Sequence, residues 1–576
     1  MSAALTDGTI NEEVRKKIED SLLATRKGGK VDIRDEQRRS VAIFENGVAF
    51  AAQGEKDSSI VTDALRSARR AGISVSRSEI IELRPEQILL LYENADQNQE
   101  EGVVGESKVR RQQEAKEIIA DATARKASDI HIIVGKQGHT NIWFRSYGRR
   151  MRYKTLTNKE AMMIIEAIFS VARDVFGESA LNVRQGALDQ ESGLLPRKIQ
   201  MIRLQYTPQN NARGALIMRL IPYSSASDND ISKLGYSKKH LEYFAMMRKR
   251  TNGLYILAGK VSSGKTTTLQ RTLNTMYLEK NREILIFTIE DPVELELEDA
   301  IQMVAKPQPD PHRKDRTIDG FEAGIASLLR SDANVGVLGE VRLASTARRA
   351  VEAVMTGHAL WTTVHTGSAL RILGRLLDLE VEPYKLSDPD IVAGLIYQRL
   401  VGTICPCCRI RMDHGYKLGL IKRELAKDTV RVTGQDVKQL WLRGNGRVPN
   451  ADKDPSAWER CPAGCMSGLN GRTVVAEVVI PDEKILADFA RNKDQVAARD
   501  YWTKPESEGG LGGKPTIHHA LTKVGAGLID INEVEEEVNF VSTYIREYGH
   551  LIPTLHEDVR EMITEIEGQK KAQEGE

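Results

Sequence analysis

Eight residues near the middle of the chain have the types and spacing of a phosphate-binding loop. Residues 259–266 read G-K-V-S-S-G-K-T and fit the pattern G-x-x-x-x-G-K-[ST] without a gap. The glycines allow backbone N–H groups to turn inward and surround phosphate oxygens. Lys265 would then reach the β- and γ-phosphates, and the Thr266 hydroxyl would hold Mg²⁺. The motif predicts nucleotide binding and leaves the use of the nucleotide open.

The segments on either side of this loop have the patterns that a phosphate-binding loop requires. Residues 253–258 form a short apolar run that predicts a strand, and from Thr266 onward the apolar side chains recur with helical spacing. This context disfavours the alternative, a glycine-rich turn that matches by chance. We expect seven residues to hold the nucleotide: Gly259, Ser262, Ser263, Gly264, Lys265, Thr266 and Thr267.

Two further apolar runs end on an acidic residue. Residues 284–289 lead into Glu290, and residues 335–339 lead into Glu340. Runs of this kind are typical of strands buried on both faces of a parallel sheet. Ligands bind at the carboxyl edge of such sheets, so both carboxylates would lie near the phosphates and the magnesium ion.

Hydroxyl and imidazole groups flank a predicted short strand at residues 359–361. His358 precedes this strand, and Thr362, Thr363 and His365 follow it. An isolated histidine is more often structural, but two at the ends of one strand could form hydrogen bonds with a γ-phosphate. The spacing alone leaves both roles open for His358 and His365.

All five cysteines of the chain lie in one region. Cys405 and Cys408 form a C-x-x-C pair, and Cys461 and Cys465 form a C-x-x-x-C pair. Two close pairs can supply the four thiolates of a tetrahedral Zn²⁺ site, which would be structural because no coordination position stays open. Cys407 is an alternative ligand. Free thiols or a redox pair are the competing interpretations.

The composition sets limits on the class of protein. The 576 residues are long enough for three or four domains, and the formal net charge is +1. There is no run of about 18 apolar residues and no secretory signal pattern, so we expect a soluble, cytosolic chain. The near-zero charge, without a basic stripe bearing aromatic residues, predicts no direct contact with nucleic acid.

The N-terminal part, residues 1–105, is predicted to be a small α/β docking domain. Two short apolar runs around Asn46-Gly47 predict a β-hairpin, and residues 60–71 have helical spacing. The polar residues 94–107 predict a linker. No residue here suggests catalysis, so docking or packing is the favoured role.

Residues 106–233 are predicted to form a second small α/β domain, with a helix at 159–175. Its predicted strands are residues 127–133, 141–145, 200–206 and 215–221. Arg203 and Arg219 each lie inside an apolar strand pattern. A strand arginine most often pairs with a local carboxylate or faces water, and a role at a phosphate is the alternative.

The rest of the chain divides into two predicted parts. Residues 234–480 contain the phosphate loop, the strand-end acids and a zinc lobe at 400–475. Residues 481–576 have helical spacing and show no residues typical of catalysis.

The third region resembles the secretion ATPase family that drives type II secretion and type IV pilus assembly. The resemblance covers roughly residues 108–541. It rests on four boxes in the family's order, which are the phosphate loop, the aspartate box at 288–294, the strand L-G-E-V-R at 338–342 and the histidine box at 356–365. A set of four such boxes is highly specific.

The resemblance implies a fold and an assembly. Each subunit would pair a small PAS-like α/β domain with a RecA-like ATPase domain, followed here by a zinc-binding lobe and a helical C-terminal region. Six such subunits would form a ring. The four-cysteine lobe is similar to that of assembly and secretion members, whereas the family's retraction motors usually lack it.

The resemblance also implies roles for individual residues. Arg203 and Arg219 would be arginine fingers that reach the phosphates of ATP, and Glu290 would be the base that orients the attacking water. Glu340 would organise Mg²⁺. His365, with His358, would contact the γ-phosphate.

The sequence departs from the family pattern at two places. Lys260 follows the first loop glycine where a proline is common, and Leu343 follows the box arginine where an acid is common. The first change leaves the phosphate-binding residues intact. The second puts a local salt bridge in doubt.

The sequence therefore predicts a hexameric ATP-hydrolysing motor, cytoplasmic and peripheral at the bacterial inner membrane, that powers pilus assembly or type II secretion. Its partner would be an inner-membrane platform protein. One alternative is a conjugative or DNA-uptake motor of the same family. Another is an ATP-gated scaffold with negligible turnover.

Overall fold

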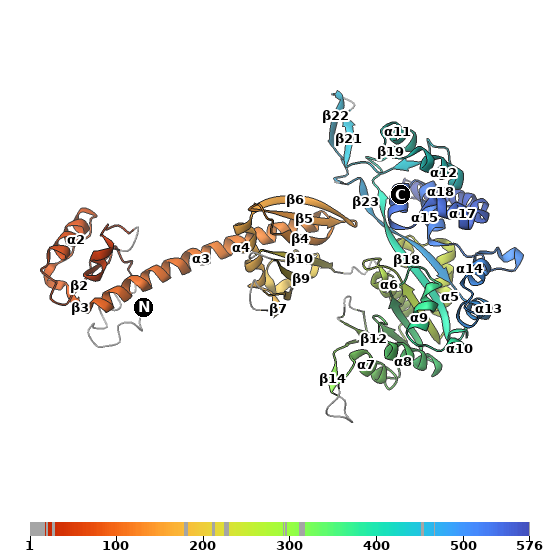
Figure 1. Ribbon diagram of the computed structural model, residues 1–576, viewed down its shortest axis with the longest axis horizontal. Coiled ribbons are helices and arrows are strands. Elements are labelled where there is room, and N and C mark those ends of the chain that lie inside the picture. Colours follow the sequence, from red (N-terminus) through yellow and green to blue (C-terminus); the bar gives the residue numbers. More distant parts are fainter. Residues whose placement is uncertain are drawn as a thin grey trace.

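The computed structural model describes residues 18, 21–25, 29–177, 182–209, 213–223, 230–291, 293, 297–309, 317–450, 454–465 and 467–574. Figure 1 shows an elongated molecule with a small N-terminal domain at one end, an antiparallel sheet in the middle and a large α/β body at the other end. The predicted α/β class is confirmed.

The N-terminal domain contains a three-stranded sheet in the order β1-β2-β3. β1 (Val41–Ile43) and β2 (Ala49–Ala52) form the predicted antiparallel hairpin. The helix α2 (Ser59–Arg70) leads to β3 (Ile81–Leu83), which pairs parallel with β2. Aliphatic and aromatic side chains of these elements form a separate hydrophobic core.

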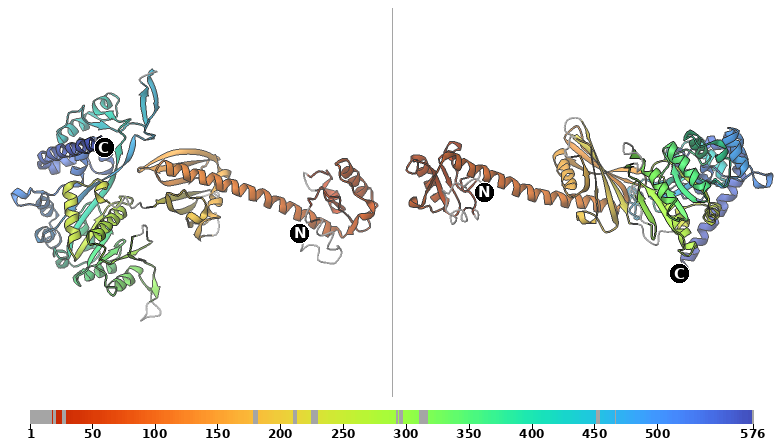
Figure 2. Two further views of the ribbon diagram at one scale, coloured as in Figure 1. Left: turned by 180° about the vertical axis from the view of Figure 1, so that it is seen from behind. Right: turned by 90° about the horizontal axis from the view of Figure 1, so that it is seen from below.

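A single helix, α3 (Pro85–Ala124), connects this domain to the middle of the molecule. Its 40 residues span about 60 Å at 1.5 Å per residue, and Figure 2 shows it bridging the two domains in both views. The linker predicted at residues 94–107 lies within this helix, so the connection between the two domains is helical. That segment combines Glu and Gln, which are good helix formers, with two glycines, and its polarity suits a helix that crosses solvent.

The middle domain is a seven-stranded antiparallel sheet in the order β6-β5-β4-β10-β9-β8-β7. The helices α3 and α4 (Asn158–Phe169) pack together and contact β4, β5 and β6. The strands are β4 (Ala127–Ile133), β5 (His139–Ser146), β6 (Arg149–Thr157), β7 (Arg173–Phe176), β8 (Arg184–Leu188), β9 (Ile199–Gln209) and β10 (Arg213–Pro222). The helix predicted at residues 159–175 ends early because β7 adds to the edge of the sheet.

The large body is organised around a second seven-stranded sheet, in the order β13-β12-β16-β17-β11-β18-β23. All pairs are parallel except β18 with β23. The strands are β11 (Gly253–Ala258), β12 (Ile286–Glu290), β13 (Ile301–Val304), β16 (Val335–Leu338), β17 (Ala359–Val364), β18 (Val392–Ile404) and β23 (Leu469–Val479).

Two hydrophobic layers enclose this sheet, which explains why its strands are apolar on both faces. One layer includes α5 and α6, and the other includes α7, α8 and α9. The helices are α5 (Lys238–Lys249), α6 (Lys265–Glu279), α7 (Gly320–Leu328), α8 (Ala344–Met355), α9 (Arg371–Asp378) and α10 (Pro383–Leu386). A small hairpin of β14 (Gln308–Pro309) and β15 (Thr317–Ile318) lies beyond β13.

The cysteine-containing lobe is inserted between β18 and β23. It contains short paired strands and two helices, and its hairpin of β21 and β22 projects from the body in Figure 1. The elements are β19 (Ile410–Arg411), α11 (Met412–Lys417), α12 (Arg423–Thr433), β20 (Trp441–Leu442), β21 (Arg447–Asn450) and β22 (Asp454–Arg460).

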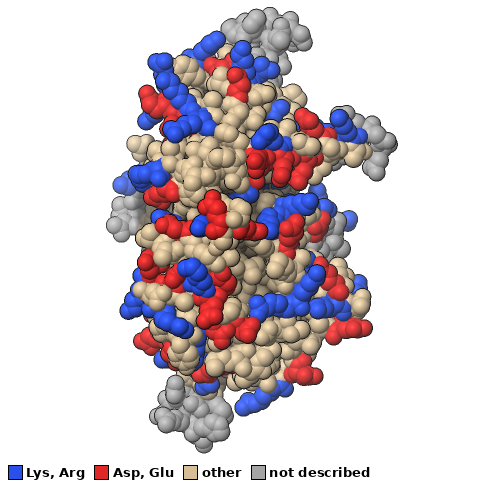
Figure 3. All heavy atoms as spheres, turned by 90° about the vertical axis from the view of Figure 1, so that its right-hand side faces the viewer, with Lys and Arg blue, Asp and Glu red and all other residues tan. Residues whose placement is uncertain are grey.

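The C-terminal region is helical, as predicted. Its helices are α13 (Glu483–Leu486), α14 (Gln495–Thr503), α15 (Thr516–Gly525), α16 (Ile531–Glu537), α17 (Val541–Tyr548) and α18 (Ile552–Glu574). Acidic and basic side chains are interspersed over this face of the molecule, without a large area of one sign (Figure 3). Of the helices that the structure describes, none has both the length and the apolar character needed to cross a membrane.

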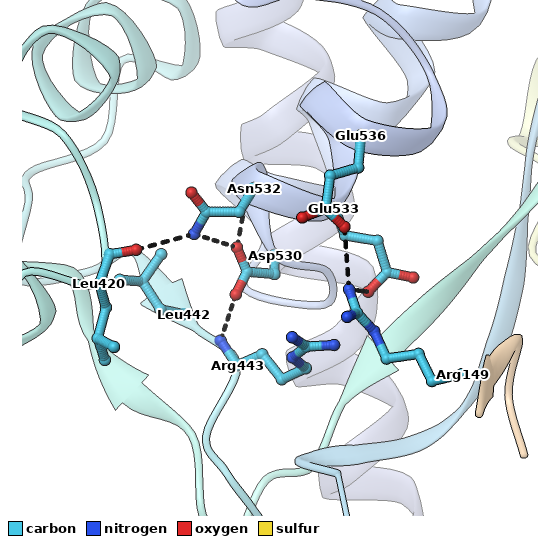
Figure 4. A pocket seen from close by; sticks show the side chains of 8 residues that line it. All are labelled: Arg149, Leu420, Leu442, Arg443, Asp530, Asn532, Glu533 and Glu536. Carbon is cyan, nitrogen blue, oxygen red and sulfur yellow. Dashed lines mark hydrogen bonds and ion pairs between the residues drawn. The ribbon is translucent and has the colours of Figure 1, made fainter. Parts of the chain in front are cut away.

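A small pocket lies where the middle sheet meets the C-terminal helices (Figure 4). Arg149 of β6 reaches α16, and its Nη2 lies 3.2 Å from Glu536 Oε2 and 3.9 Å from Glu533 Oε2. Glu533 is buried, and its Oε1 accepts a hydrogen bond of 2.6 Å from the Gly402 amide of β18. One carboxylate therefore links the middle domain to the central sheet of the body.

Buried histidines fix the C-terminal helices against the body. The rings of His240 on α5 and His519 on α15 are both buried, with centroids 4.8 Å apart, and His519 Nδ1 accepts from the Ala476 amide of β23. Burial, reinforced by the charge of Lys523, lowers the pKa of His240 to about 3 and that of His519 well below its usual range. Both histidines are neutral in the folded protein.

Acid should therefore destabilise the fold. Below the unfolded-state pKa of about 6.5, unfolding takes up a proton at each histidine, which lowers the free energy of unfolding by about 1.4 kcal/mol per pH unit and group. We expect urea unfolding to show lower stability at pH 5.5 than at pH 7.5, and His240→Phe to weaken this dependence. His550, which is exposed, provides the matched control His550→Phe, and equal pH dependence of both variants would contradict the assignment.

Candidate nucleotide site and metal centre

The phosphate loop connects β11 to α6, as the sequence predicts. Ser262 and Gly264 have φ values of +62° and +84°, so the chain turns sharply through the left-handed region before the helix. Gly264 is the N-cap of α6, and Thr266 and Thr267 lie half-buried in its first turn. The loop therefore presents its backbone at a helix N-terminus, where partial positive charge favours an anion.

Lys265 folds over the loop that contains it. Its Nζ donates to the carbonyl oxygens of Gly259, at 3.1 Å, and Lys260, at 3.4 Å. These two bonds hold the ammonium group beside the first residues of the loop.

A buried glutamine supports the loop from below. Gln398 of β18 donates from Nε2 to the Ser263 carbonyl at 2.8 Å and accepts at Oε1 from the Tyr236 hydroxyl at 2.6 Å. The Tyr236 hydroxyl also lies 3.2 Å from Thr268 Oγ1 on α6. No role is predicted for Gln398 from the sequence. A signal is nevertheless present, because an amide side chain within the apolar run 392–401 would be buried and would need hydrogen-bond partners.

Glu290 is held at the end of β12. Its Oε1 accepts hydrogen bonds from Thr288 Oγ1 at 2.7 Å and from Gln302 Nε2 at 3.2 Å. Two donors on one oxygen fix the orientation of the carboxylate. In the predicted aspartate box, Pro292 and Glu294 lie outside the described residues.

The structure brings Glu340 and His365 together beside the loop. Gly259 O accepts from His365 Nδ1 at 3.0 Å, which assigns the ring proton to Nδ1 because a carbonyl can only accept. His365 Nε2 lies 3.9 Å from Glu340 Oε2, and the carboxylate of Glu340 also forms an ion pair with Arg342. β12 and β16 are neighbours, so Glu290 and Glu340 share this edge of the sheet.

His358 lies at the other end of the same strand. β17 runs from Ala359 to Val364, three residues longer than predicted, and pairs parallel with β11 over its whole length. His358 O accepts from the Gly253 amide, at the edge of the sheet where β11 begins. A six-residue strand is about 20 Å long, so the structure does not bring His358 to the loop of its own chain.

Arg203 and Arg219 lie in the middle domain, on a different sheet from the loop. They are directly opposite each other on β9 and β10. Arg219 Nε donates to Asp129 Oδ1 of β4 at 3.1 Å. The local carboxylate that a strand arginine usually requires is therefore present.

Four cysteines form a compact cluster. The Sγ atoms of Cys405, Cys408, Cys461 and Cys465 all lie within 4.8 Å of one another, with Cys405 and Cys461 at 3.7 Å and Cys408 and Cys465 at 3.3 Å. These distances are too long for disulfides, while four sulfurs around Zn²⁺ at about 2.3 Å would lie roughly 3.8 Å apart. Cys407 is exposed and is not part of the cluster. The donor set therefore fits a tetrahedral metal ion.

Backbone contacts hold the two cysteine knuckles in place. The Cys405 amide donates to Gly468 O at 2.8 Å, and the Cys461 amide donates to Gly446 O at 2.9 Å. A Cβ atom on Gly444 would lie 1.8 Å from the Cys408 carbonyl oxygen, so no larger residue fits there. The cluster joins the end of β18 to the start of β23.

Residues 105–536 match the family model described as "Type II/IV secretion system protein". The chain belongs to this family. The first 104 residues, which include the N-terminal sheet, lie outside the match.

Similar proteins carry related names. "Type II secretion system protein E" of Dickeya dadantii is 30% identical over 376 residues, which cover 64% of this chain and 65% of that protein. "Type II secretion system ATPase E" of Vibrio cholerae is 29% identical over 295 residues, or 51% of this chain and 54% of that protein. The chain thus spans less than two thirds of the length of both relatives.

Solved structures also resemble this family member. The pilus retraction motor PilT with bound ADP has a TM-score of 0.44 at 21% identity, covering 73% of this chain and 96% of PilT. The ATPase DotB of Yersinia pseudotuberculosis has a TM-score of 0.47 at 18% identity, covering 73% of this chain and 92% of DotB.

Removing the support of the loop should loosen it. Gln398→Ala leaves the Ser263 carbonyl and the Tyr236 hydroxyl without their partner, which costs roughly 1–3 kcal/mol for buried groups. We expect lower thermal stability and faster amide hydrogen exchange in residues 259–266. The exposed Gln53→Ala should change neither, and unchanged exchange in Gln398→Ala would refute the supporting role.

The cysteine cluster should bind one zinc ion per chain. Metal analysis of purified protein should find zinc in the parent and in Cys407→Ser, and a loss of zinc with reduced thermal stability in Cys408→Ser. The reason is that the cluster uses all four of its thiolates and excludes the exposed Cys407. Zinc-free folded parent protein, or loss of zinc in Cys407→Ser, would contradict this assignment.

Proposed function

We propose that this chain is a Mg²⁺-dependent ATP hydrolase that works as a hexameric motor in type IV pilus assembly or type II secretion. One observation carries the proposal. The phosphate loop, His365 and Glu340 meet at the carboxyl edge of one parallel sheet, with the imidazole 3.0 Å from the loop carbonyl of Gly259. Ligands bind at this edge in open α/β sheets.

Residues of the loop would hold the nucleotide. Backbone N–H groups from Gly259 to Thr267, among them those of Ser262, Ser263 and Gly264, would surround the phosphates, and Lys265 would leave the loop carbonyls to contact the β- and γ-phosphates. The Thr266 hydroxyl would be a ligand of Mg²⁺. The ion, when bound, neutralises charge on the transferring phosphoryl group.

The strand-end acids would act on water and on the magnesium shell. Glu290 is oriented by Thr288 and Gln302, as a base that positions an attacking water must be. Glu340 would order the water ligands of Mg²⁺. Its ion pair with Arg342 would then break, or the carboxylate would contact Arg342 and the water ligands together. His365 donates from Nδ1 to the loop, and Nε2 would donate to the γ-phosphate, which requires a proton on both ring nitrogens.

The second sheet would complete the site. Arg203 and Arg219 would reach the phosphates as arginine fingers when the middle domain of the same or a neighbouring subunit closes on the loop. Such fingers contribute about 10³ to 10⁵ in rate where they have been measured, so an isolated subunit would turn over slowly. His358, at the opposite edge of the sheet, has no role in the site of its own chain in this proposal.

The remaining parts would connect the motor to its machine. A zinc ion on the four cysteines would be structural, because no coordination position is left for a reactant. The N-terminal domain, residues 1–105, would dock the motor to an inner-membrane platform protein, which would place the ring at the cytoplasmic face of that membrane. The family membership and the four-cysteine lobe support a pilus or secretion machine.

The proposal is tested by ATP hydrolysis with Mg²⁺ by the assembled protein. Lys265→Ala should lower turnover to background, because the ammonium group stabilises the transferring phosphoryl group. Lys427→Ala, an exposed lysine on α12, removes the same charge and should keep the parental rate. Parental turnover in Lys265→Ala would show that the assigned site is wrong.

A further inference from the structure

Five neighbouring strands of the middle sheet place charged side chains in a single row. The directly paired residues are, in order across the sheet, Arg150, Arg145, Asp129, Arg219 and Arg203. Residues directly opposite each other on paired strands share a face of the sheet, with Cβ atoms about 4.5–5.5 Å apart. Four arginines therefore flank one carboxylate. The row is invisible in the sequence because its members are up to 90 residues apart.

Asp129 is the centre of this row. Its side chain is 8% exposed, and Oδ1 accepts from Arg219 Nε at 3.1 Å. Oδ2 accepts from Ser128 Oγ at 2.9 Å and lies 3.9 Å from Arg145 Nε, too far for a hydrogen bond. The charge of Asp129 also acts on Arg472 of β23. Of these three arginines, Arg219 has the direct hydrogen bond.

The contact uses one particular nitrogen of Arg219. A guanidinium group has five N–H donors in a rigid fork, and the bond to Asp129 occupies Nε. The two Nη groups are left for a second anion, and the side chain of Arg219 is half exposed. Because Asp129 is buried on a central strand, its carboxylate is a fixed anchor.

We propose that Asp129 positions Arg219 for the reaction, by holding Nε so that the Nη pair is presented to the phosphates of the bound nucleotide. This inference rests on the proposed ATP hydrolysis with Arg219 as an arginine finger. The bond restricts a side chain that otherwise loses rotamer entropy when it binds phosphate. The negative charge also offsets the repulsion of Arg219 by Arg203, its neighbour in the row, and by Arg145 on the other side of Asp129.

A positioning role makes a prediction that a purely structural role does not. Removing the anchor matters for turnover only while Arg219 is present. A displacement of about 1 Å in a reacting group can cost about 10²-fold in rate, whereas nucleotide binding by the loop does not involve Asp129. The turnover number should therefore fall with KM for MgATP unchanged.

The experiment measures steady-state ATP hydrolysis by the assembled full-length protein. Arg219→Ala should lose about 10³-fold or more in kcat, and Asp129→Ala about 10²-fold with KM within twofold of the parent. Asp129→Asn keeps an oxygen that accepts from Nε and should recover most of the turnover. The double variant Asp129→Ala/Arg219→Ala should be no slower than Arg219→Ala alone.

Arg145 provides the matched control, because it lies on the other side of Asp129 without a hydrogen bond. Arg145→Ala should retain turnover within a few-fold of the parent, and Asp129→Ala should still slow it in that background. Where Asp129→Ala does not fold, Asp129→Glu replaces it. The longer side chain keeps the charge but displaces the guanidinium group, so kcat falls with KM unchanged.

Two results would overturn the inference. One is parental kcat in Asp129→Ala or Asp129→Glu, and the other is an equal loss from Asp129→Ala with and without Arg219.

Different results would show that the proposed ATP hydrolysis, or the role of Arg219 in it, is wrong. Parental turnover in Arg219→Ala removes the finger role, and parental turnover in Lys265→Ala removes the assigned site.

Discussion

The hydrogen bond from Gln398 to the Ser263 carbonyl connects the phosphate loop to the one strand on which the rest of the body depends. β18 has 13 residues, and its first half pairs with β11 in the parallel sheet. Its last residue pairs with the loop before α16 through the Ile404 amide, and Cys405 of the metal cluster follows directly. A shift of this strand therefore moves the Gln398 support of the phosphate loop, the cysteine cluster and the C-terminal helices together, since packed cores transmit strain.

β23, the antiparallel partner of β18, extends the same coupling to the other side of the site. Glu477 on this strand is buried, and its two oxygens accept from the Ala369 amide, close after His365, and from the Thr516 amide of α15. Burial raises the pKa of this carboxyl group. Three buried donors are the compensation that a buried acid requires. The histidine segment and the C-terminal helices therefore share one anchor on the central sheet.

The sequence predicted the parts of the site that depend on local pattern. The phosphate loop, Glu340 at a strand end and the two cysteine pairs each have a signature within a few residues. Gln398 and Asp129 have none, because their importance comes from partners more than 80 residues away. For His358 the relation between sequence and space is the opposite. The two ends of β17 are close in sequence, but a strand places them at opposite edges of the sheet.

Under the proposed function, the charge row would allow a site that is divided between two sheets to open and close. Four guanidinium groups and one carboxylate give the row a formal charge of +3 (4 − 1), confined to one line across the middle sheet. Arg149, next to Arg150 of the row, forms ion pairs with Glu533 and Glu536 of α16. Anionic groups of the body therefore already attract the middle sheet. In that proposal, a bound nucleotide would add negative charge on the body that attracts Arg203 and Arg219, the two arginines of the row that reach the phosphates. Hydrolysis and phosphate release would remove part of that charge, because ADP would stay in the loop, and would weaken the electrostatic attraction between the two sheets. The chemical step would then cause the change in charge that allows the domain movement.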